Sequence, residues 1–371
     1  MEILKISLVN FRNYSNVKID FNKKMNILIG DNAQGKTNIL ESIVMLALTK
    51  SHRVGVNPNI IQFNKDKCII KGKVKNDRIS NNLEISITEI KKTTKINQSE
   101  IKKIADYISY LKVIIFTPDD LEIVKSSPNV RRNLLNIELS QISKTYLNTY
   151  NEYNKILKTR NEYLKILFNN SIADKEYLNI LTDKLIEKAV IIYQLRKNYI
   201  DLVNEKIDYY FEKISKTSGL KVIYVPNIEI NDYETEKLTK QLQDLFRKNQ
   251  NKELNYGMTM CGPHRDELIF SLLNNDLKYF GSQGQQKLAI LAFKLSEIDI
   301  FKEKSGTYPV LLLDDIFSEF DIKKQKELLK LINSMDIQSI LTTTDLKKID
   351  KKYLNDSYIF KVKSGTIEKV G

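Results

Sequence analysis

Residues 30 to 37 read Gly30-Asp31-Asn32-Ala33-Gln34-Gly35-Lys36-Thr37, and this octapeptide constrains the rest of the chain more than any other segment. It satisfies the phosphate-binding pattern GxxxxGK[ST] in full. In that pattern the glycines let backbone N–H groups wrap a phosphate, the lysine reaches the terminal phosphates, and the Ser or Thr hydroxyl is offered to Mg²⁺. The segment predicts that all eight residues bind the phosphates of a nucleotide, with Lys36 also catalytic and Thr37 also a metal ligand.

The residues on both sides of this loop fit a strand, loop and helix in that order. The apolar run at residues 25–29 predicts a short strand that enters Gly30. After Lys36 the apolar residues recur at helical spacing, which predicts a helix with one apolar face. That face consists of Ile39, Ile43, Leu46 and Ala47.

A second candidate element follows the apolar run Val310–Leu313, where Asp314 and Asp315 stand side by side. Open α/β sheets bind ligands at the carboxyl ends of their strands. We expect Asp314 to hold Mg²⁺ directly or through water, and Asp315 to orient or deprotonate an attacking water. On its own the segment equally fits a buried strand ending in a solvated acidic turn. Paired with the phosphate loop, it indicates a Walker B element.

Between these elements lies a polar turn, Ser282 to Gln286, directly before a helix that is predicted to begin near Lys287. A glycine-bearing turn at a helix N-terminus can bind an anion. Ser282 would then contact, in trans, the γ-phosphate of an ATP held by another subunit. An ordinary Ser/Gly cap explains the same residues, and only their place upstream of the Walker B strand favours the functional interpretation.

The middle of the chain is different in character. Residues 119–215 contain one Pro and no Gly, and their apolar and Tyr residues recur at helical spacing, which predicts a helical arm. The polar stretch 169–171 is expected to reverse it into a helical hairpin. The arm carries a stripe of Tyr146, Tyr150, Tyr153 and Leu157, for which a seam between helices is favoured over a platform for stacking bases.

Composition narrows the class of protein. The 371 residues include 59 Lys and Arg against 46 Asp and Glu, a formal net charge of +13, which favours nucleic acid as a partner, although solvated Lys from an AT-rich genome explains it too. Cys68 and Cys261 form no CxxC pair, so neither a disulfide framework nor a zinc knuckle is predicted. No signal peptide or membrane span is indicated, and we expect a cytoplasmic protein.

Several motifs in a fixed order carry a resemblance to a known family. The chain resembles the RecF family of recombination mediators over nearly its whole length, and the third and fourth motifs that follow are more specific than the phosphate loop. Besides that loop, the matching segments are Asn10-Phe11-Arg12-Asn13-Tyr14, Ser51-His52-Arg53, Gly262-Pro263-His264-Arg265-Asp266, Gly281-Ser282-Gln283-Gly284-Gln285-Gln286 and Leu313-Asp314-Asp315.

The resemblance implies an α/β fold: an ABC-type P-loop ATPase head with a mixed sheet and an antiparallel extension, plus a helical-hairpin arm. We expect the head at residues 1–118 and 262–371 and the mainly helical arm lobe at 119–261. It also implies that residues 30–37 bind ATP, that residues 318–321 form the loop after Walker B, and that Ser282 belongs to a signature turn. Arg12 and Arg53 are weaker candidates for nucleotide contact.

The implied function is ATP-dependent DNA binding in recombinational repair and replication-fork recovery. Two heads close on ATP and Mg²⁺ as a homodimer on single- and double-stranded DNA near gaps, and a RecR-type mediator protein helps to load the recombinase. The alternatives are a motor or transporter-type ATPase that works by turnover, and a metabolic P-loop kinase. The signature turn and the helical arm disfavour the kinase.

Two features of the wider ABC class are missing. Thr342-Thr343-Thr344-Asp345 stands where a switch histidine is expected, and Pro118-Asp119-Asp120 stands where a glutamine is expected. Both departures predict slow hydrolysis, with ATP acting mainly as a switch. The lack of a switch histidine and of a membrane-partner segment weighs against a motor or transporter. The DNA contacts stay open: Arg131, Arg132, Lys155, Lys158 and Arg160 are plausible phosphate contacts, but ordinary solvated side chains are favoured.

Overall fold

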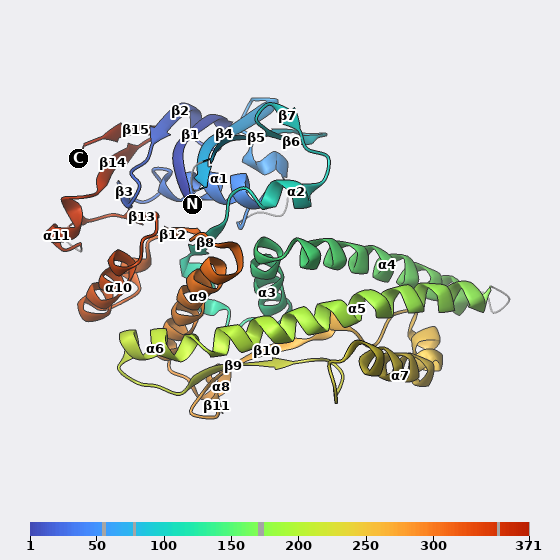
Figure 1. The fold of residues 1–371 in the computed structure, drawn as a ribbon. Coiled ribbons are helices and arrows are strands. Elements are labelled where there is room, and N and C mark those ends of the chain that lie inside the picture. The colour runs from blue at the N-terminus through green and yellow to red at the C-terminus, as the bar shows by residue number, and fades with distance from the viewer. Residues whose placement is uncertain (54–56, 77–78, 170–173, 347–348, 371) are drawn as a thin grey trace. The chain divides into compact units, whose positions relative to one another are not determined.

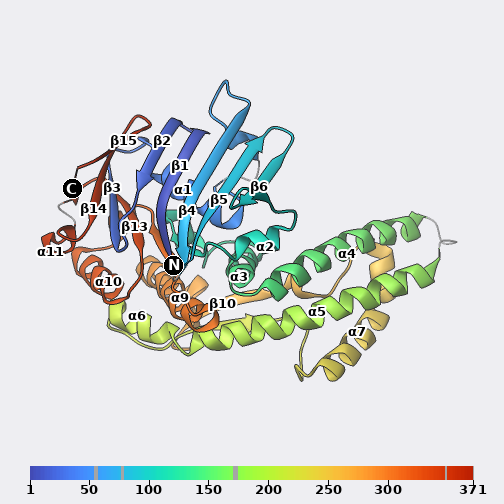
Figure 2. The ribbon, with the colours of Figure 1, turned by 45° about the horizontal axis from the view of Figure 1, so that its top comes forward.

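The structure is a computed structural model and describes residues 1–53, 57–76, 79–169, 174–346 and 349–370 (Figures 1 and 2). Contacts divide the chain into two compact units. The first contains Met1–Glu122, Ile207–Ser218 and Gln283–Gly371, and the second contains Ile123–Lys206 and Gly219–Ser282.

The first unit contains a mixed sheet that brings together strands from the two ends of the chain. The strand order is β15-β14-β3-β13-β12-β8, parallel throughout except for the antiparallel pair of β14 with β15. The strands are β3 (Met25–Ile29), β8 (Val113–Phe116), β12 (Val310–Leu313), β13 (Ser339–Thr343), β14 (Tyr358–Lys363) and β15 (Thr366–Lys369). The predicted strands at 25–29 and 310–313 thus flank the strand at 339–343.

A second sheet of the same unit is antiparallel and has the order β2-β1-β4-β5-β6-β7. Alternation of apolar and polar residues along its strands matches their alternation of buried and exposed side chains, as expected for a sheet with one covered face. Its strands are β1 (Glu2–Phe11), β2 (Tyr14–Asp20), β4 (Lys67–Asn76), β5 (Ile79–Thr88), β6 (Lys92–Ile96) and β7 (Ser99–Glu100). This sheet is the predicted antiparallel extension.

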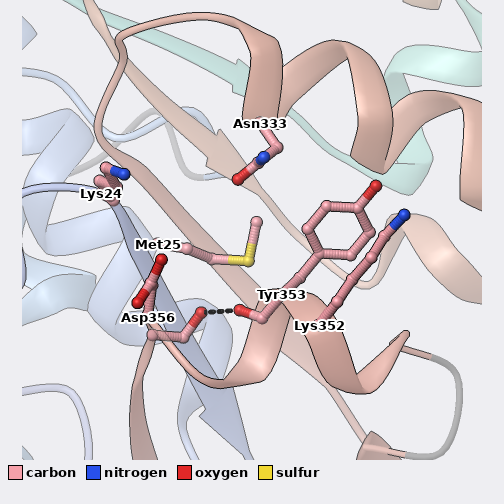
Figure 3. A pocket seen from close by; sticks show the side chains of 7 residues that line it. Lys24, Met25, Asn333, Lys352, Tyr353 and Asp356 are labelled. Carbon is pink, nitrogen blue, oxygen red and sulfur yellow. Dashed lines mark hydrogen bonds between the residues drawn. The ribbon is translucent and has the colours of Figure 1, made fainter.

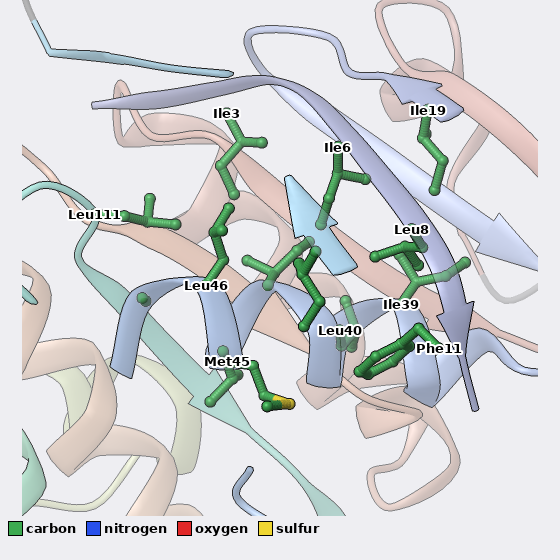
Figure 4. Close-up of a cluster of buried hydrophobic side chains, with 14 of the residues drawn as sticks. Ile3, Ile6, Leu8, Phe11, Ile19, Ile39, Leu40, Met45, Leu46 and Leu111 are labelled. Carbon is green, nitrogen blue, oxygen red and sulfur yellow. The ribbon is translucent and has the colours of Figure 1, made fainter. Parts of the chain in front are cut away.

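Helix α1 (Lys36–Leu48) packs against strands of both sheets and supplies much of the core (Figure 4). The predicted face of Ile39, Ile43, Leu46 and Ala47 is buried. The expectation of a single apolar face was too narrow, because Leu40, Val44 and Met45 are buried as well. A helix covered on two sides requires apolar residues around most of its circumference.

The remaining helices of the first unit support the sheets. Helices α6 and α10 pack against each other, α6 also packs on α9, and α9 packs on β8. These elements are η1 (Asn57–Ile60), α2 (Ile104–Ile108), η2 (Pro118–Glu122), α6 (Ile207–Ser215), α9 (Gln283–Ser305), η4 (Ile316–Ser318), α10 (Ile322–Ser334) and α11 (Lys351–Leu354). Because α6 packs on α9, residues 207–218 belong to this unit, whereas the sequence assigned them to the arm lobe.

The second unit is the predicted helical arm with a small antiparallel sheet of order β11-β10-β9. Strand β10 pairs with β9, so residues 262–282 join this unit, although the sequence placed them in the head. Its elements are α3 (Pro128–Ile142), α4 (Lys144–Asn169), α5 (Lys175–Asn204), β9 (Leu220–Val225), α7 (Thr235–Tyr256), η3 (Pro263–Arg265), β10 (Glu267–Leu272), β11 (Asn275–Asp276) and α8 (Leu277–Phe280). Of the predicted reversal at 169–171, residues 170 and 171 lie outside the described residues.

Buried hydrogen bonds join the helices of the arm to the segment 262–266. The Arg196 guanidinium, which is fully buried, donates to Asp266 Oδ2 and to the Pro263 carbonyl, each at 2.6 Å. Tyr146 is also buried and accepts a hydrogen bond from Arg196 Nε at 3.1 Å. Tyr153 is buried too, with its hydroxyl 2.6 Å from His264 Nδ1. The interpretation of the Tyr stripe as a seam between helices is supported at Tyr146, which contacts α5, whereas Tyr153 contacts the segment 262–266.

Two of the arginines considered as DNA contacts are interior ion pairs. Arg131 is 3% exposed and binds both carboxylate oxygens of Glu267, at 2.7 and 2.6 Å. Arg160 is 1% exposed and donates to Glu253 Oε2 at 2.6 Å. Both the phosphate-contact and the solvated interpretation were wrong for these side chains, because a carboxylate partner distant in the chain is invisible in the local sequence. A buried charge is retained only with such partners.

The burial of His264 makes the stability of the arm depend on pH. Burial, with the nearby guanidinium groups of Arg265, Arg132 and Arg196, lowers the pKa of His264 from 6.5 to about 4. The unfolded chain therefore binds a proton that the native state does not, between these two values. Stability is unaffected by this group above pH 6.5 and falls as the pH is lowered towards 4, by roughly 3 kcal/mol.

The expected result is that His264→Gln, whose amide still offers a partner to Tyr153, loses this part of the pH dependence. Urea unfolding of both proteins above pH 6.5 and near pH 4 measures it. Because all other titrating groups are shared, the difference between the two proteins isolates His264. An equal loss of stability in wild type and variant would contradict the assignment.

Candidate functional site

The loop between β3 and α1 lies at the carboxyl ends of the parallel strands. Gly30 N–H donates to the Thr343 carbonyl of β13 at 3.4 Å, and a Cβ at Gly30 would stand 2.3 Å from the Val362 carbonyl oxygen of β14. Gly35 has φ 112° at the start of α1, and its missing side chain leaves room for Asn13 and Tyr14. Only glycine satisfies both constraints, which explains the glycines of the pattern.

Turns from two other strand pairs hold the loop in place. The Tyr14 hydroxyl donates to the Gly35 carbonyl at 3.0 Å, and Asn13 Nδ2 donates to the Gln34 carbonyl at 3.1 Å. Ser364, in the turn between β14 and β15, donates its N–H to Gln34 Oε1 at 2.8 Å. Asn13 and Tyr14 entered the sequence analysis only through a resemblance, and nothing in the sequence near Ser364 indicates its role.

The Lys36 amine lies over the loop. Its Nζ donates to the carbonyls of Gly30 at 2.6 Å and Asp31 at 2.8 Å. Burial lowers the pKa of Lys36, while the carboxylates of Asp315, Asp314 and Asp31 act in the opposite direction. The amine thus stands close to both carboxylates of the predicted Walker B pair, where a cation can also meet phosphate oxygens.

The structure brings Thr37 and Asp314 together. Thr37 Oγ1 donates to Asp314 Oδ1 at 3.0 Å, and the same oxygen accepts a hydrogen bond from Thr342 Oγ1 at 2.8 Å. Mg²⁺ in nucleotide sites is held by one or two protein oxygens, with water and phosphate completing the octahedron. Thr37 Oγ1 and Asp314 Oδ1 fit this kind of Mg²⁺ site. Among the described residues, no cluster of His, Cys, Asp and Glu could hold a metal ion without such additional ligands.

Asp315 has a left-handed backbone conformation, with φ 45° and ψ 28°. Its N–H donates to Thr342 Oγ1 at 2.8 Å, and its carbonyl accepts a hydrogen bond from Ser318 Oγ at 2.7 Å. A residue other than glycine in this region costs of order 1–3 kcal/mol, and such residues are concentrated at functional sites. The left-handed backbone turns Asp315 away from the direction of the strand.

Arg12 and Arg53, the weaker candidates for nucleotide contact, converge on Glu41 of α1. Arg12 binds both Glu41 oxygens at 2.9 and 2.6 Å, and Ser51 Oγ donates to Glu41 Oε1 at 2.5 Å. Burial acts to raise the pKa of Glu41, but the hydrogen bonds from Arg12 and Ser51 outweigh it, so the pKa lies below its usual value. Arg53 is more exposed and donates to Asn38 Oδ1 at 3.0 Å. Arg12 is therefore a structural partner of Glu41, and contact of Arg12 and Arg53 with nucleotide stays a prediction.

His52 lies between these tethered residues. Both of its ring nitrogens are buried, and neither has a hydrogen-bond partner among the described residues. Burial lowers the pKa of His52, against the effect of Glu41, Asp120 and Asp314. The imidazole is therefore neutral at physiological pH.

Ser282 is the last residue of the second unit and is exposed directly before α9. Further along α9, Lys287 Nζ donates to Glu319 Oε2 at 2.7 Å and ties the helix to the loop after Walker B. That loop is also held by Gln325 Nε2, which donates to the carbonyls of Phe317 at 2.5 Å and Phe320 at 2.7 Å. The role of Ser282 in trans stays a prediction.

A polar hollow of about 240 Å³ lies at the other end of the parallel sheet, where β3 begins (Figure 3). Lys24, Met25, Asn333, Lys352, Tyr353 and Asp356 line it. Strands of parallel sheets present their ligand sites at the carboxyl ends. The hollow is at the opposite ends, so we place the functional site at the loop of residues 30–37.

A family model described as "RecF/RecN/SMC N terminal domain" matches residues 2–367. The DNA replication and repair protein RecF of Oceanobacillus iheyensis is 39% identical over 99% of this chain and 100% of its own length. RecF of Listeria monocytogenes is 38% identical over the full length of both. The chain belongs to the RecF family.

Solved structures agree with the RecF assignment. The structures of the recombination mediator protein RecF with ATPrS and with ATP, described as part of the RecFOR pathway, each have a TM-score of 0.91 and 30% identity. They cover all of this chain and 98% and 97% of their own. An Smc head domain from Pyrococcus furiosus has a TM-score of 0.55 at 15% identity, which shows the fold alone.

Membership in the RecF family confirms the predicted fold class, an ABC-type P-loop ATPase head with a helical arm. In the part of the chain that the structure describes, no helix is long and apolar enough to cross a membrane. The predicted assignment of ATP to residues 30–37, of Mg²⁺ to Thr37 and Asp314, and of catalysis to Lys36, Asp315 and Ser282 stays a proposal.

The geometry of the loop predicts the effect of Gly35→Ala. The new Cβ would stand 2.6 Å from Asn13 Nδ2 and 2.7 Å from the Tyr14 hydroxyl, at a φ that alanine avoids. We expect the variant to weaken binding of a fluorescent ATP analogue by about 10- to 100-fold. Equilibrium titration measures it.

Gly306→Ala is the matched control. Gly306 also has a positive φ, of 73°, but apart from its chain neighbours no atom of the described residues lies within 4 Å of a Cβ placed there. The control should lose roughly 1 kcal/mol of stability and keep its affinity for the analogue. Equal affinities in the two variants would mean that the loop conformation does not control binding.

Proposed function

We propose that this chain is an ATP-dependent DNA-binding factor of replication and repair, in which ATP closes two copies into a dimer on DNA and slow hydrolysis releases it. The observation that carries the proposal is the 3.0 Å contact between Thr37 Oγ1 and Asp314 Oδ1. It joins the phosphate loop to the Walker B strand at one point, as a Mg²⁺·ATP site requires.

The residues of the chain divide the work. Backbone N–H groups of the loop and the N-terminus of α1 bind the phosphates, and Lys36 pairs with the terminal ones. Mg²⁺, when held by Thr37 and Asp314, neutralises charge on the phosphate oxygens. Asp315 orients the attacking water or accepts its proton. The tethered α9 and the loop after β12 keep these groups in register.

Dimer closure rests on the signature turn. Ser282 is exposed, belongs to a different unit from the phosphate loop, and precedes a long helix. A helix N-terminus with an exposed hydroxyl can bind the γ-phosphate of a second copy. The relatives solved with ATP and with ATPrS support nucleotide binding by this chain. Closure of two copies through Ser282 is the further step that we propose.

DNA binding is supported by charge and family. The formal net charge of +13 attracts a polyanion, and curated relatives are named DNA replication and repair proteins. Lys155 and Lys158 of α4 are exposed and stay available for phosphate contacts. The relatives' description as recombination mediators of the RecFOR pathway supports a RecR-type protein partner. A role near single-strand gaps, in the cytoplasm, is part of the proposal.

The first test is the molar mass in solution without nucleotide, with ATP and with ADP, each with and without gapped DNA. Wild type should pass from monomer to dimer with ATP and retain DNA. Lys36→Ala should bind ATP about 100-fold or more weakly and stay monomeric, because it loses a charge-assisted contact to phosphate. A mass and a DNA affinity that ignore ATP would contradict the proposal.

Asp315→Asn is the complementary variant. Asn is nearly isosteric with Asp and tolerates the left-handed conformation, so the fold is kept. ATP binding and dimer formation should persist, while hydrolysis slows and the dimer lives longer. Light scattering after ATP is diluted measures the lifetime, and a dimer that dissociates as fast as wild type argues against a role of Asp315 in hydrolysis.

Ser282→Arg tests the signature turn separately. The variant should bind ATP with wild-type affinity, because Ser282 is not one of the residues of its own phosphate loop. Its bulky side chain should block dimer closure. Analytical ultracentrifugation with ATP distinguishes the outcomes, and a normal dimer counts against contact in trans.

A further inference from the structure

Thr342 of β13 hydrogen-bonds to both residues of the acidic pair. Its Oγ1 donates to Asp314 Oδ1 at 2.8 Å and accepts the N–H of Asp315 at 2.8 Å. The side chain is fully buried. A single hydroxyl thus fixes the carboxylate of one acidic residue and the backbone of the next.

We propose that Thr342 is a positioning residue for the Mg²⁺·ATP site, setting the orientation of Asp314 and the turned backbone of Asp315 before metal or nucleotide binds. This inference rests on the proposed function of the site. It assigns a role to a residue of the segment 342–345, which stands where the wider ABC class has its switch histidine.

The geometry of Asp314 explains why a positioning group is needed. A carboxylate at the end of a strand can rotate about its terminal torsion, which is broad. Thr37 Oγ1 also donates to Asp314 Oδ1. If the Thr37 hydroxyl turned a lone pair towards Mg²⁺, however, this hydrogen bond would change when the metal binds. Thr342 comes from the neighbouring strand, and its bond does not depend on the metal. It can therefore hold Oδ1 in place in both states.

The second bond acts on Asp315. Its left-handed backbone is less favourable than an extended one, although Asp and Asn adopt it more readily than other residues except glycine. A buried N–H without a partner costs about 1–3 kcal/mol. Thr342 Oγ1 accepts the Asp315 N–H when the backbone is left-handed. If the strand continued in an extended conformation, this N–H would point in a different direction. Thr342 therefore couples the direction of the Asp315 side chain to the position of Asp314.

An ordinary structural role is the competing explanation, since threonine is common in strands. The two explanations differ in what they predict for serine. Serine keeps the hydroxyl and removes the methyl group, whereas valine keeps the shape and removes the hydroxyl. If Thr342 acts only by packing, the valine variant should behave like wild type. If it acts by positioning, the serine variant should behave like wild type.

The experiment compares Thr342→Val and Thr342→Ser with wild type in the full chain. The first readout is amide hydrogen exchange of peptides covering residues 310–318, without nucleotide or metal. The second is the Mg²⁺ concentration that gives half-maximal binding of a fluorescent ATP analogue, and the third is binding of the same analogue in EDTA. Hydrolysis is measured last.

The expected result is faster exchange in residues 310–318 and a Mg²⁺ half-saturation raised about 10- to 100-fold in Thr342→Val, with binding in EDTA unchanged. Thr342→Ser should stay within about threefold of wild type, since the hydroxyl is what matters. Unchanged exchange and Mg²⁺ dependence in Thr342→Val overturn the proposal, and so does a serine variant as impaired as the valine variant.

Thr259→Val is the matched control for loss of a buried hydroxyl. Thr259 is 1% exposed in the second unit, and its Oγ1 also makes two hydrogen bonds, to Asn161 Oδ1 at 2.7 Å and from Arg160 at 2.8 Å. It should lose stability without a change in Mg²⁺ dependence. If wild type itself does not bind the analogue, the proposed function fails, while the exchange measurement still tests the positioning role.

Discussion

The hydrogen bond between Thr37 and Asp314 joins residues separated by 277 positions in the chain. It can form only if β3, β13 and β12 lie side by side in parallel, so that the loop after β3 and the acidic pair after β12 meet at one edge. That order in turn requires α1 to be buried against the sheets, which its apolar residues allow. The site and the core are therefore consequences of one arrangement of strands.

Polar groups of the site are held mostly by neighbours outside the recognised motifs. Asn13, Tyr14 and Ser364 fix the loop, Thr342 fixes the acidic pair, and Gln325 fixes the segment that follows. Hydrogen bonds of this kind reduce the freedom that a ligand would otherwise have to remove on binding. The loop residues are recognisable because phosphate chemistry restricts them, whereas their supports come from turns whose partners are set by the fold.

The sequence predicted the strand, loop and helix around residues 30–37 and the strand before Asp314. Each of these elements has apolar residues at a regular spacing, bounded by polar or glycine residues. It also predicted the seam between helices at Tyr146 from helical spacing. It did not predict the ion pairs of Arg131 and Arg160, since their carboxylate partners lie more than 90 positions away. Burial of α1 on several sides and the placing of α6 with α9 were missed for the same reason: each depends on contacts between distant segments.

The position of β3 has a consequence for how the protein is made. Strand β3 is synthesised early, but both of its neighbours, β13 and β14, follow residue 338. Chains emerge from the ribosome N-terminus first. For most of translation the phosphate loop therefore lacks its contacts with Thr343, Val362 and Ser364. A partly made chain therefore has no finished nucleotide site, and the switch becomes operable only when the acidic strand and the closing hairpin have been added.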